Sequence, residues 1–206
     1  MPYPARRLHN RPAGRRLALL TICLVLLGSQ AAQAGCGHVR LAPRGGVRGV
    51  APLAIGDSVM YGAAWKLSHR GFEVDAMCGR SPAAGLYTLR NRRRRGTLPE
   101  IVLVALGTNV FPTSRDISRM RRVLGPRRTL MLVTPFRKWR PGGGAGMRRA
   151  ARRHPRRVEL IDWSGLARFN HEWFWSDGTH LRDSGELAYA RLLRNAAWSR
   201  QRGRFG

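Results

Sequence analysis

One serine in the sequence stands where nucleophilic chemistry is possible. Ser58 lies in Gly56-Asp57-Ser58-Val59, directly after the apolar run 51–55 and before a stretch with helical spacing. A serine at a strand-to-helix turn can expose its hydroxyl at the edge of a sheet, with its backbone N–H at the anion-binding end of the helix. The same residues are also typical of a plain turn with a helix cap, so the motif alone leaves both interpretations open.

An Asp–His pair near the end of the chain could activate such a serine. Asp177-Gly178-Thr179-His180-Leu181 precedes the last stretch with helical spacing. Serine is a weak nucleophile until a neighbouring base takes its proton, and a third group must orient that base. An Asp three residues before a His can place a carboxylate beside one ring nitrogen and leave the other free. A capped helix start with a surface histidine remains the alternative.

Two further residues could donate hydrogen bonds to a negatively charged oxygen. Asn109, in Gly107-Thr108-Asn109, follows the apolar run 101–106, and Gly79 follows the run 72–77. A side-chain amide and an unshielded backbone N–H are both donors of the kind that forms an oxyanion hole. Each residue also has an ordinary interpretation, as a turn residue or as a glycine that ends a strand.

The elements that must position these residues alternate along the chain. Short apolar runs bounded by Gly, Pro or charge are typical of buried parallel strands, and they occupy 51–55, 72–77, 101–106, 129–133 and 158–161. The stretches with helical spacing are 61–69, 82–95, 114–124, 147–154 and 183–198.

This alternation predicts an α/β fold: a three-layer sandwich around a five-stranded parallel sheet in the flavodoxin-like order 2-1-3-4-5. We expect the domain to span 51–198, with 35–50 a loose lead-in and 199–206 a flexible tail. Ligands of such sheets bind at the carboxyl ends of the strands. Every motif above lies at such an end or before the last helix.

Ser58, Gly79, Asn109 and His180 occur in the order of the motifs that give SGNH (GDSL-like) hydrolases their name. The chain resembles this family over nearly all of its length after residue 50. The resemblance implies the SGNH hydrolase fold, with Ser58 attacking an acyl carbonyl, His180 taking its proton and Asp177 orienting the imidazole. It also implies an oxyanion hole made of the Ser58 and Gly79 backbone N–H groups and the Asn109 amide. No cofactor is expected.

Two departures from the family pattern point to a subgroup. Val110 stands where an acid usually follows the Asn, and Val-Met follows Ser58 in place of x-Ser/Thr. Both are similar to the extracytoplasmic SGNH domains of peptidoglycan and polysaccharide O-acyltransferases. The stretch Val74-Asp75-Ala76-Met77-Cys78-Gly79-Arg80 and the pair Asp162-Trp163 fit the same subgroup.

The resemblance therefore implies a serine esterase that acts on small O-acyl esters through an acyl-serine intermediate. Acetyl groups on cell-envelope polysaccharide are the expected substrate. Two alternatives stay open on the sequence. One is an O-acyltransferase that passes the acyl group to a glycan hydroxyl with the same residues, and the other is a non-catalytic glycan-binding module.

The first 34 residues have the features of an export signal. Residues 1–16 contain five arginines and no acid, 17–27 are apolar, and Ala32-Gln33-Ala34 forms a cleavage motif. This predicts a signal peptide cleaved after Ala34 and a secreted, periplasmic or cell-envelope location. The membrane is then met only during export. An uncleaved anchor remains an alternative, but the apolar run is short for a membrane span. Cys36 and Cys78 could pair in an exported chain, which the sequence leaves open.

The charge is strongly basic. Five of the 38 basic residues lie in the signal, so the other 33 and the 11 acidic residues leave +22 on the remainder. Such a balance often indicates nucleic-acid binding. Here nearly every base is Arg, the charges are spread over several helices and loops, and export removes the chain from the genome. We therefore expect no specific nucleic-acid partner.

The remaining histidines and aromatics give weaker signals. His69, His154 and His171 lack ligand spacing with acids or cysteines, so no metal site is predicted. The aromatic cluster before the Asp–His motif is expected to pack in the core, with a sugar-binding wall as the alternative. Its members are Trp163, Trp173, Phe174 and Trp175.

Overall fold

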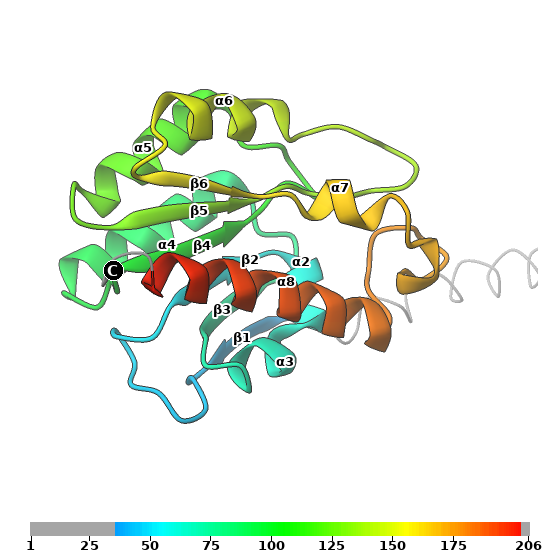
Figure 1. Cartoon of the computed structure of the whole chain (residues 1–206), viewed down its shortest axis with the longest axis horizontal. Helices are drawn as coiled ribbons and strands as arrows, with labels where there is room; N and C mark the ends of the chain where they lie inside the picture. Colours follow the sequence, from blue (N-terminus) through cyan, green and yellow to red (C-terminus); the bar gives the residue numbers. More distant parts are fainter. Residues whose placement is uncertain (1–35, 203–206) are drawn as a thin grey trace, which may run out of the picture. The chain divides into compact units, whose positions relative to one another are not determined.

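The computed structural model describes residues 36–202, and the predicted signal peptide lies outside them. The α/β fold lies in one compact unit, which begins at Gly37. In that unit a six-stranded sheet lies between two layers of helices (Figure 1). Within 36–202, no helix combines the length and apolar character needed to cross a membrane.

The strands are β1 (His38–Leu41), β2 (Leu53–Gly56), β3 (Glu73–Met77), β4 (Ile101–Ala105), β5 (Thr129–Val133) and β6 (Val158–Ile161). Their order in the sheet is β1-β3-β2-β4-β5-β6. Strands β2 to β6 are mutually parallel, and their order confirms the predicted 2-1-3-4-5 arrangement.

The predicted count of five strands was wrong, because β1 pairs antiparallel with β3 at one edge of the sheet. This strand lies in the segment expected to be a loose lead-in. Its sequence, His-Val-Arg-Leu, alternates exposed and partly buried positions. A short, polar edge strand of this kind has no continuous apolar run to reveal it.

The helices are α2 (Ser58–Gly62), α3 (Ala64–Ser68), α4 (Pro82–Arg94), α5 (Ser114–Leu124), α6 (Ala145–Arg153), α7 (Trp163–Ala167), the 3₁₀ turn η1 (His171–Trp173) and α8 (Asp183–Arg202). The predicted helix 61–69 is thus two short helices. Helix α8 also continues to Arg202 through the first part of the predicted flexible tail. Residues 203–206 lie outside the described part.

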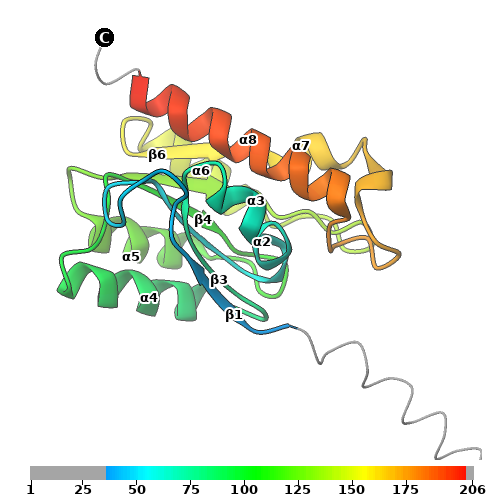
Figure 2. The ribbon, with the colours of Figure 1, turned by 90° about the horizontal axis from the view of Figure 1, so that it is seen from below.

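Successive side chains of each strand point to opposite faces of the sheet, so a hydrophobic core lies on each face. On β4, Leu103 contributes to the cluster under α2, α3 and α8, while Val102 and Val104 contribute to the cluster under α4 and α5. Figure 2 shows these helices on opposite sides of the sheet. All three side chains are almost fully buried, and burial of an aliphatic side chain stabilises a fold by roughly 1.5–3 kcal/mol.

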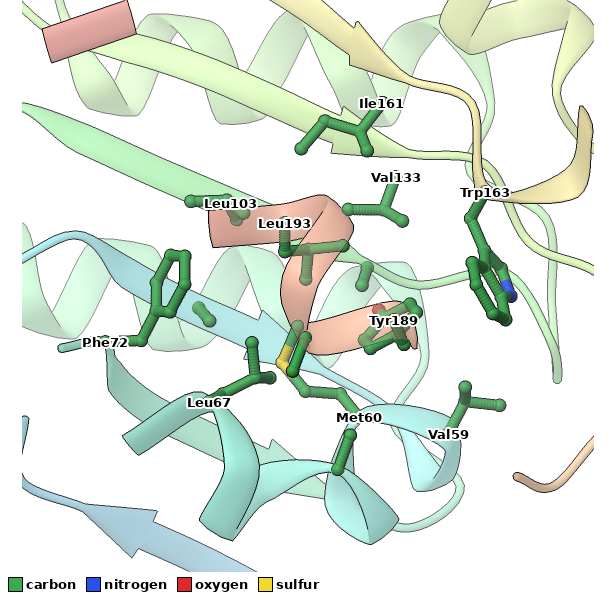
Figure 3. Packing of buried hydrophobic residues seen from close by; sticks show 14 of the residues in the cluster. Val59, Met60, Leu67, Phe72, Leu103, Val133, Ile161, Trp163, Tyr189 and Leu193 are labelled. Atoms are coloured by element: carbon green, nitrogen blue, oxygen red, sulfur yellow. The ribbon is translucent and has the colours of Figure 1, made fainter. Parts of the chain in front are cut away.

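The predicted aromatic packing is confirmed for three residues of the cluster. Trp163 is buried and lies nearly parallel to Trp173, with ring centroids 5.7 Å apart. It meets Tyr189 edge-on, with centroids 5.0 Å apart, and Figure 3 shows these two residues in the core. Phe174 is buried in the same core. Trp175 differs, because 57% of it is exposed.

Cysteine pairing was left open by the sequence. In the structure both Cys36 and Cys78 are disulfide-bonded. The backbone N–H of Cys78 also donates to the Gly37 oxygen at 2.9 Å, which continues the β1–β3 ladder.

Candidate active site

The strand-to-helix turn after β2 places Ser58 at the first position of α2. Asp57 is the N-cap, and its Oδ1 accepts from the Val59 N–H at 3.2 Å. A Cβ added at Gly56 would lie 2.3 Å from the Met60 Cβ, so only glycine lets α2 begin so close to the strand. The chain therefore turns sharply, with Ser58 at the carboxyl end of the sheet.

A continuous chain of hydrogen bonds joins Ser58, His180 and Asp177. The Nε2 of His180 lies 2.9 Å from the Ser58 Oγ, and its Nδ1 lies 2.6 Å from the Asp177 Oδ2. A proton on Nδ1 is donated to the carboxylate, which leaves Nε2 to accept from the serine hydroxyl. The structure thus brings together three residues that the sequence spreads over 120 positions or more.

The turn that contains Asp177 and His180 is held mainly by its own backbone. The Trp175 N–H donates to the His180 oxygen, and the Gly178 N–H donates to the Trp175 oxygen, both at 2.9 Å. Gly178 adopts φ +64°, a conformation that glycine reaches without strain. The Asp177 Oδ1 accepts from two backbone N–H groups, those of Thr179 and His180, each at 2.9 Å.

These bonds determine the charge state of Asp177. Partial burial acts to raise the pKa of this carboxyl group. The hydrogen bonds from the His180 ring and from the His180 and Thr179 N–H groups outweigh burial, so the pKa lies below its ordinary value. An ionised carboxylate at this place can stabilise a positive charge on the neighbouring imidazole ring.

The two predicted oxyanion donors follow the strands on either side of β2. Gly56, the last residue of β2, is in register with Ala76 on β3 and Ala105 on β4. Gly79 comes shortly after β3 and Asn109 shortly after β4. Both residues are exposed, at the same edge of the sheet as the Ser58 turn.

Gly79 lies in a tight turn from Met77 to Arg80. The Arg80 N–H donates to the Met77 oxygen at 3.2 Å, and Gly79 has φ +69°. A positive φ at the third position of such a turn is typical of type II geometry and favours glycine. The hydrogen bond that closes the turn comes from Arg80, not from Gly79.

Asp57 links two segments of the candidate site, whereas sequence reasoning treated it only as part of a motif. Its Oδ2 accepts from the Thr108 hydroxyl at 2.6 Å and from the Thr108 N–H at 3.2 Å, and its own N–H donates to the Ala105 oxygen at 3.2 Å. Asp57 therefore couples the Ser58 turn to the loop that holds Asn109. Burial raises the pKa of Asp57 although the hydrogen bonds from Thr108 act to lower it.

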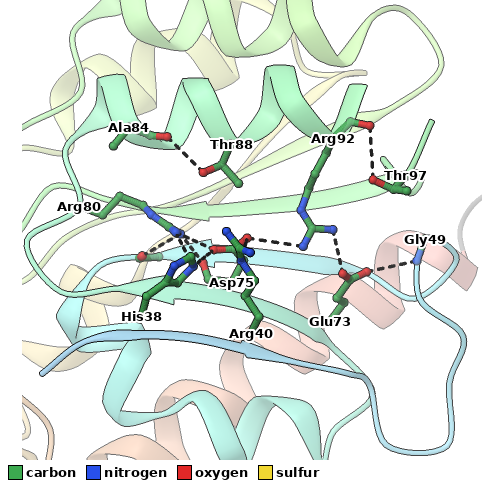
Figure 4. Close-up of polar contacts among 11 residues, drawn as sticks. His38, Arg40, Gly49, Glu73, Asp75, Arg80, Ala84, Thr88, Arg92 and Thr97 are labelled. Atoms are coloured by element: carbon green, nitrogen blue, oxygen red, sulfur yellow. Dashed lines mark hydrogen bonds and ion pairs between the residues drawn. The ribbon is translucent and has the colours of Figure 1, made fainter. Parts of the chain in front are cut away.

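Arg80 holds the ends of β2 and β3 together (Figure 4). The side chain is buried, and its Nη2 donates to the Asp75 Oδ1 at 2.6 Å. Its Nη1 donates to the backbone oxygens of Asp75 and Gly56, the latter at 3.3 Å. His38 on β1 also contacts the Asp75 Oδ1, at 2.8 Å. In the sequence, Asp75 and Arg80 are recognisable only as members of the stretch from Val74 to Arg80 that fits the O-acyltransferase subgroup.

Arg80 and its neighbours also control the ionisation of Asp75. Burial acts to raise the pKa of this carboxyl group. Hydrogen bonds from Arg80 and His38, together with the charges of Arg80 and Arg92, lower it below the ordinary value. Over residues 36–202 no cluster of three or more His, Cys, Asp or Glu side chains could hold a metal ion.

No protein-family model matches the chain. Among curated proteins, the Bacillus subtilis "Putative peptidoglycan O-acetyltransferase YrhL" is 28% identical over 144 residues, which are 68% of this chain and 23% of that protein. A Staphylococcus aureus "Putative O-acetyltransferase" is 28% identical over 142 residues, 68% of this chain and 24% of that protein. The chain thus spans less than a quarter of the length of these relatives.

Solved structures share the fold. The C-terminal catalytic domain of Streptococcus pneumoniae peptidoglycan O-acetyltransferase A, with a methylsulfonyl adduct, matches with a TM-score of 0.66 and 22% identity over 74% of this chain and 94% of that one. A Clostridium thermocellum family 3 carbohydrate esterase matches with a TM-score of 0.60 and 14% identity over 76% of this chain and 100% of that one. The resemblance found in the sequence is therefore confirmed: the chain has the SGNH hydrolase fold and is similar in sequence to proteins named as O-acetyltransferases.

Proposed function

We propose that this protein is an exported serine esterase that hydrolyses small O-acyl esters, with O-acetyl groups on cell-envelope polysaccharide as substrate. The observation that supports it most directly is the hydrogen-bonded chain Ser58–His180–Asp177 at the carboxyl edge of the sheet. The names of the relatives and structural neighbours support the acetyl group and the glycan.

In the first step the Ser58 Oγ attacks the carbonyl carbon of the ester while its proton passes to the His180 Nε2. The carbonyl oxygen becomes negatively charged and accepts hydrogen bonds from the Ser58 and Gly79 N–H groups and the Asn109 amide. His180 then gives its proton to the sugar oxygen, the bond from carbonyl carbon to that oxygen breaks, and acyl-Ser58 remains. Throughout, the Asp177 carboxylate stabilises the imidazolium.

In the second step a water molecule attacks acyl-Ser58. His180 takes a proton from the water and returns it to the Ser58 Oγ as the acyl group leaves as the carboxylic acid. Transfer uses the same residues, with a glycan hydroxyl in place of water. The relatives' names favour this second candidate, and product analysis with an acetyl donor and a glycan acceptor distinguishes the two.

The test of the esterase is hydrolysis of p-nitrophenyl acetate by the mature protein and by Ser58→Ala. Removal of the nucleophile of such a triad lowers kcat by about 10⁴- to 10⁶-fold. Ser118→Ala, an exposed serine on α5, is the matched control and should keep full activity. Equal rates for wild type and Ser58→Ala would refute the proposal, and an inactive protein that still binds glycan would be the non-catalytic module.

Export is part of the same proposal. We propose that the chain is cleaved after Ala34, so that the mature protein begins at Gly35 and acts in the cell envelope or outside the cell. N-terminal sequencing of the protein recovered from the envelope or medium tests this. A protein that keeps residues 1–34 would indicate an anchor instead.

A further inference from the structure

Two exposed tryptophans are associated with the turn that contains Asp177 and His180: Trp175 is part of the turn, and Trp139 contacts it from another loop. Trp175 is 57% exposed and Trp139 is 70% exposed. The backbone of Trp175 forms part of the turn through its hydrogen bonds with Gly178 and His180. Trp139 comes from the loop after β5, and that loop is bound to the turn because the Lys138 N–H donates to the Gly178 oxygen at 2.9 Å.

The Trp139 ring is packed directly against this turn. A Cβ added at Gly178 would lie 2.6 Å from the Lys138 Cβ and 3.1 Å from the Trp139 Nε1. The absence of a side chain at Gly178 therefore lets the indole approach the backbone one residue from Asp177. Trp175 therefore stands two residues before Asp177 in the same turn, and the Trp139 ring contacts Gly178, the residue after Asp177.

Each ring is also paired with a cation. The Lys138 Nζ lies 4.6 Å from the centre of the Trp139 ring, and the Arg182 guanidinium carbon lies 5.2 Å from the centre of the Trp175 ring. A cation near an indole face stabilises the ring by about 0.5–1 kcal/mol at an exposed site. The cation contacts therefore help to fix the orientation of each indole ring although the ring is exposed.

We propose that Trp139 and Trp175 form a stacking platform for the sugar rings of the glycan whose ester is cleaved at Ser58. One face of a pyranose presents C–H bonds and its rim presents hydroxyls, so a flat indole matches the face while Lys138 and Arg182 can donate to rim oxygens. Both rings belong to or contact the turn that carries His180, whose Nε2 lies 2.9 Å from the Ser58 Oγ, and exposed apolar surface at such a place is typical of a binding surface. This inference rests on the proposed function for its substrate.

Binding is measured first, in Ser58→Ala protein so that turnover plays no part. The probe is a β-1,4-linked N-acetylglucosamine hexasaccharide, titrated by calorimetry. Trp139→Ala and Trp175→Ala should each weaken binding by about tenfold, the size of one lost stacking contact. Trp65→Ala is the control, because Trp65 on α3 is 64% exposed but its ring lies beside His69, the C-cap of that helix, and it should bind like the parent. No binding by the parent, or equal binding by all variants, overturns the platform.

A kinetic comparison separates the platform from the proposed function. The same tryptophan variants, with Ser58 intact, are assayed on the O-acetylated hexasaccharide and on p-nitrophenyl acetate, which has no sugar. The loss of kcat/KM on the glycan should exceed the loss on the small ester by about tenfold, through KM. Equal losses on both substrates would show that the rings only hold the turn. A wild type inactive on both esters refutes the esterase, while the binding experiment still decides the platform.

Discussion

The Arg80 guanidinium donates to the backbone oxygen of Gly56 at 3.3 Å, so the turn that contains Gly79 is held against the strand end that precedes Ser58. The proposed nucleophile and one proposed oxyanion donor are therefore positioned by one buried side chain. Oxyanion donors act only when they lie where the charge develops, and removal of one costs about 10²–10³ in kcat. Arg80 is thus expected to act as a positioning residue.

Arg80→Lys tests this role. Lysine keeps the charge beside Asp75 but lacks the planar fork that reaches Asp75 and Gly56 together. We expect kcat on p-nitrophenyl acetate to fall by about 10- to 100-fold with little change in KM, because the lost contact matters only when the oxyanion forms. Arg80→Met would instead remove the buried partner of Asp75 and leave His38 and the more distant Arg40 and Arg92, which should destabilise the fold by roughly 3 kcal/mol, the low end for a broken buried ion pair.

Arg92→Ala is the matched control for Arg80→Lys. Arg92 also lies beside Asp75, at 3.5 Å from Oδ2, and binds Glu73 at 2.8 Å, but it makes no contact with Gly56. Its loss should lower the melting temperature and leave kcat unchanged. If Arg92→Ala and Arg80→Lys lost kcat equally, Arg80 would be a structural residue only.

The lowered pKa of Asp177 gives a prediction about pH. A carboxyl group whose pKa is depressed on folding stabilises the folded state above its unfolded pKa, and this stabilisation is lost as pH falls through the folded pKa. Asp177→Asn should therefore lose melting temperature relative to wild type at neutral pH, and the two should converge as the medium is acidified below about pH 4.

The same substitution tests catalysis. If the one amide oxygen of asparagine accepts from the Thr179 and His180 N–H groups, its NH2 group faces the His180 Nδ1 and favours the wrong tautomer. A neutral amide also does not stabilise the imidazolium, so kcat should fall by about 10²- to 10⁴-fold at neutral pH. Retention of more than half of the activity would show that Asp177 does not orient the base. A constant difference in melting temperature across the acid range would show that its ionisation does not contribute to stability.

Asp57→Asn should have the opposite pH dependence. Burial raises the pKa of this carboxyl group above its ordinary 3.8, so folding disfavours the ionised form. The wild-type protein therefore loses stability as pH rises from the unfolded-state pKa through the higher folded-state pKa. Asparagine carries no charge to bury, so its melting temperature relative to wild type should rise from acid to neutral pH.

Activity of Asp57→Asn should nevertheless fall. Asparagine has one acceptor oxygen, whereas Asp57 uses two, one for Val59 and one for Thr108. The loop with Asn109 is then held less firmly, and we expect kcat to fall by about tenfold or more. Thermal melts from acid to neutral pH, together with kcat, measure both effects. Unchanged kcat would show that this coupling does not position the donor.

Local sequence signals predicted much of the fold. Strand Thr129–Val133 and helix Ser114–Leu124 begin and end where expected. The strand is a buried apolar run, and the helix opens with a capping box between Thr113 and Asp116. Strand β1 gave no such signal, because its pairing with β3 depends on a partner more than 30 residues away.

The candidate site likewise has parts that local sequence signals predict and parts that depend on long-range contacts. Ser58, Asp177 and His180 could be selected because each stands in a short motif with a known chemical use. The contacts of Asp57 with Thr108 and of Arg80 with Gly56 join residues 51 and 24 positions apart. Which hydrogen-bond partners these two side chains reach depends on the alignment of the strand ends. That alignment is a property of the assembled sheet, which no local pattern records.

Gly56 connects the fold to the site and gives a last prediction. A methyl group here would lie 2.3 Å from the Met60 Cβ and 2.6 Å from its sulfur, so α2 would have to move away from β2. Overpacking of this kind costs about 1–3 kcal/mol. Because Ser58 is the first residue of α2, the same movement should lengthen the Ser58–His180 hydrogen bond and lower kcat by about 10²-fold.

Gly37→Ala is the control, because no atom lies within 4 Å of a Cβ built there. It should keep both the melting temperature and kcat. Met60→Ala combined with Gly56→Ala should not recover the lost kcat, because alanine keeps the Cβ that would lie 2.3 Å from the new methyl group. A Gly56→Ala protein with normal kcat would mean that the reach of Ser58 to His180 does not depend on the close approach of α2 to β2.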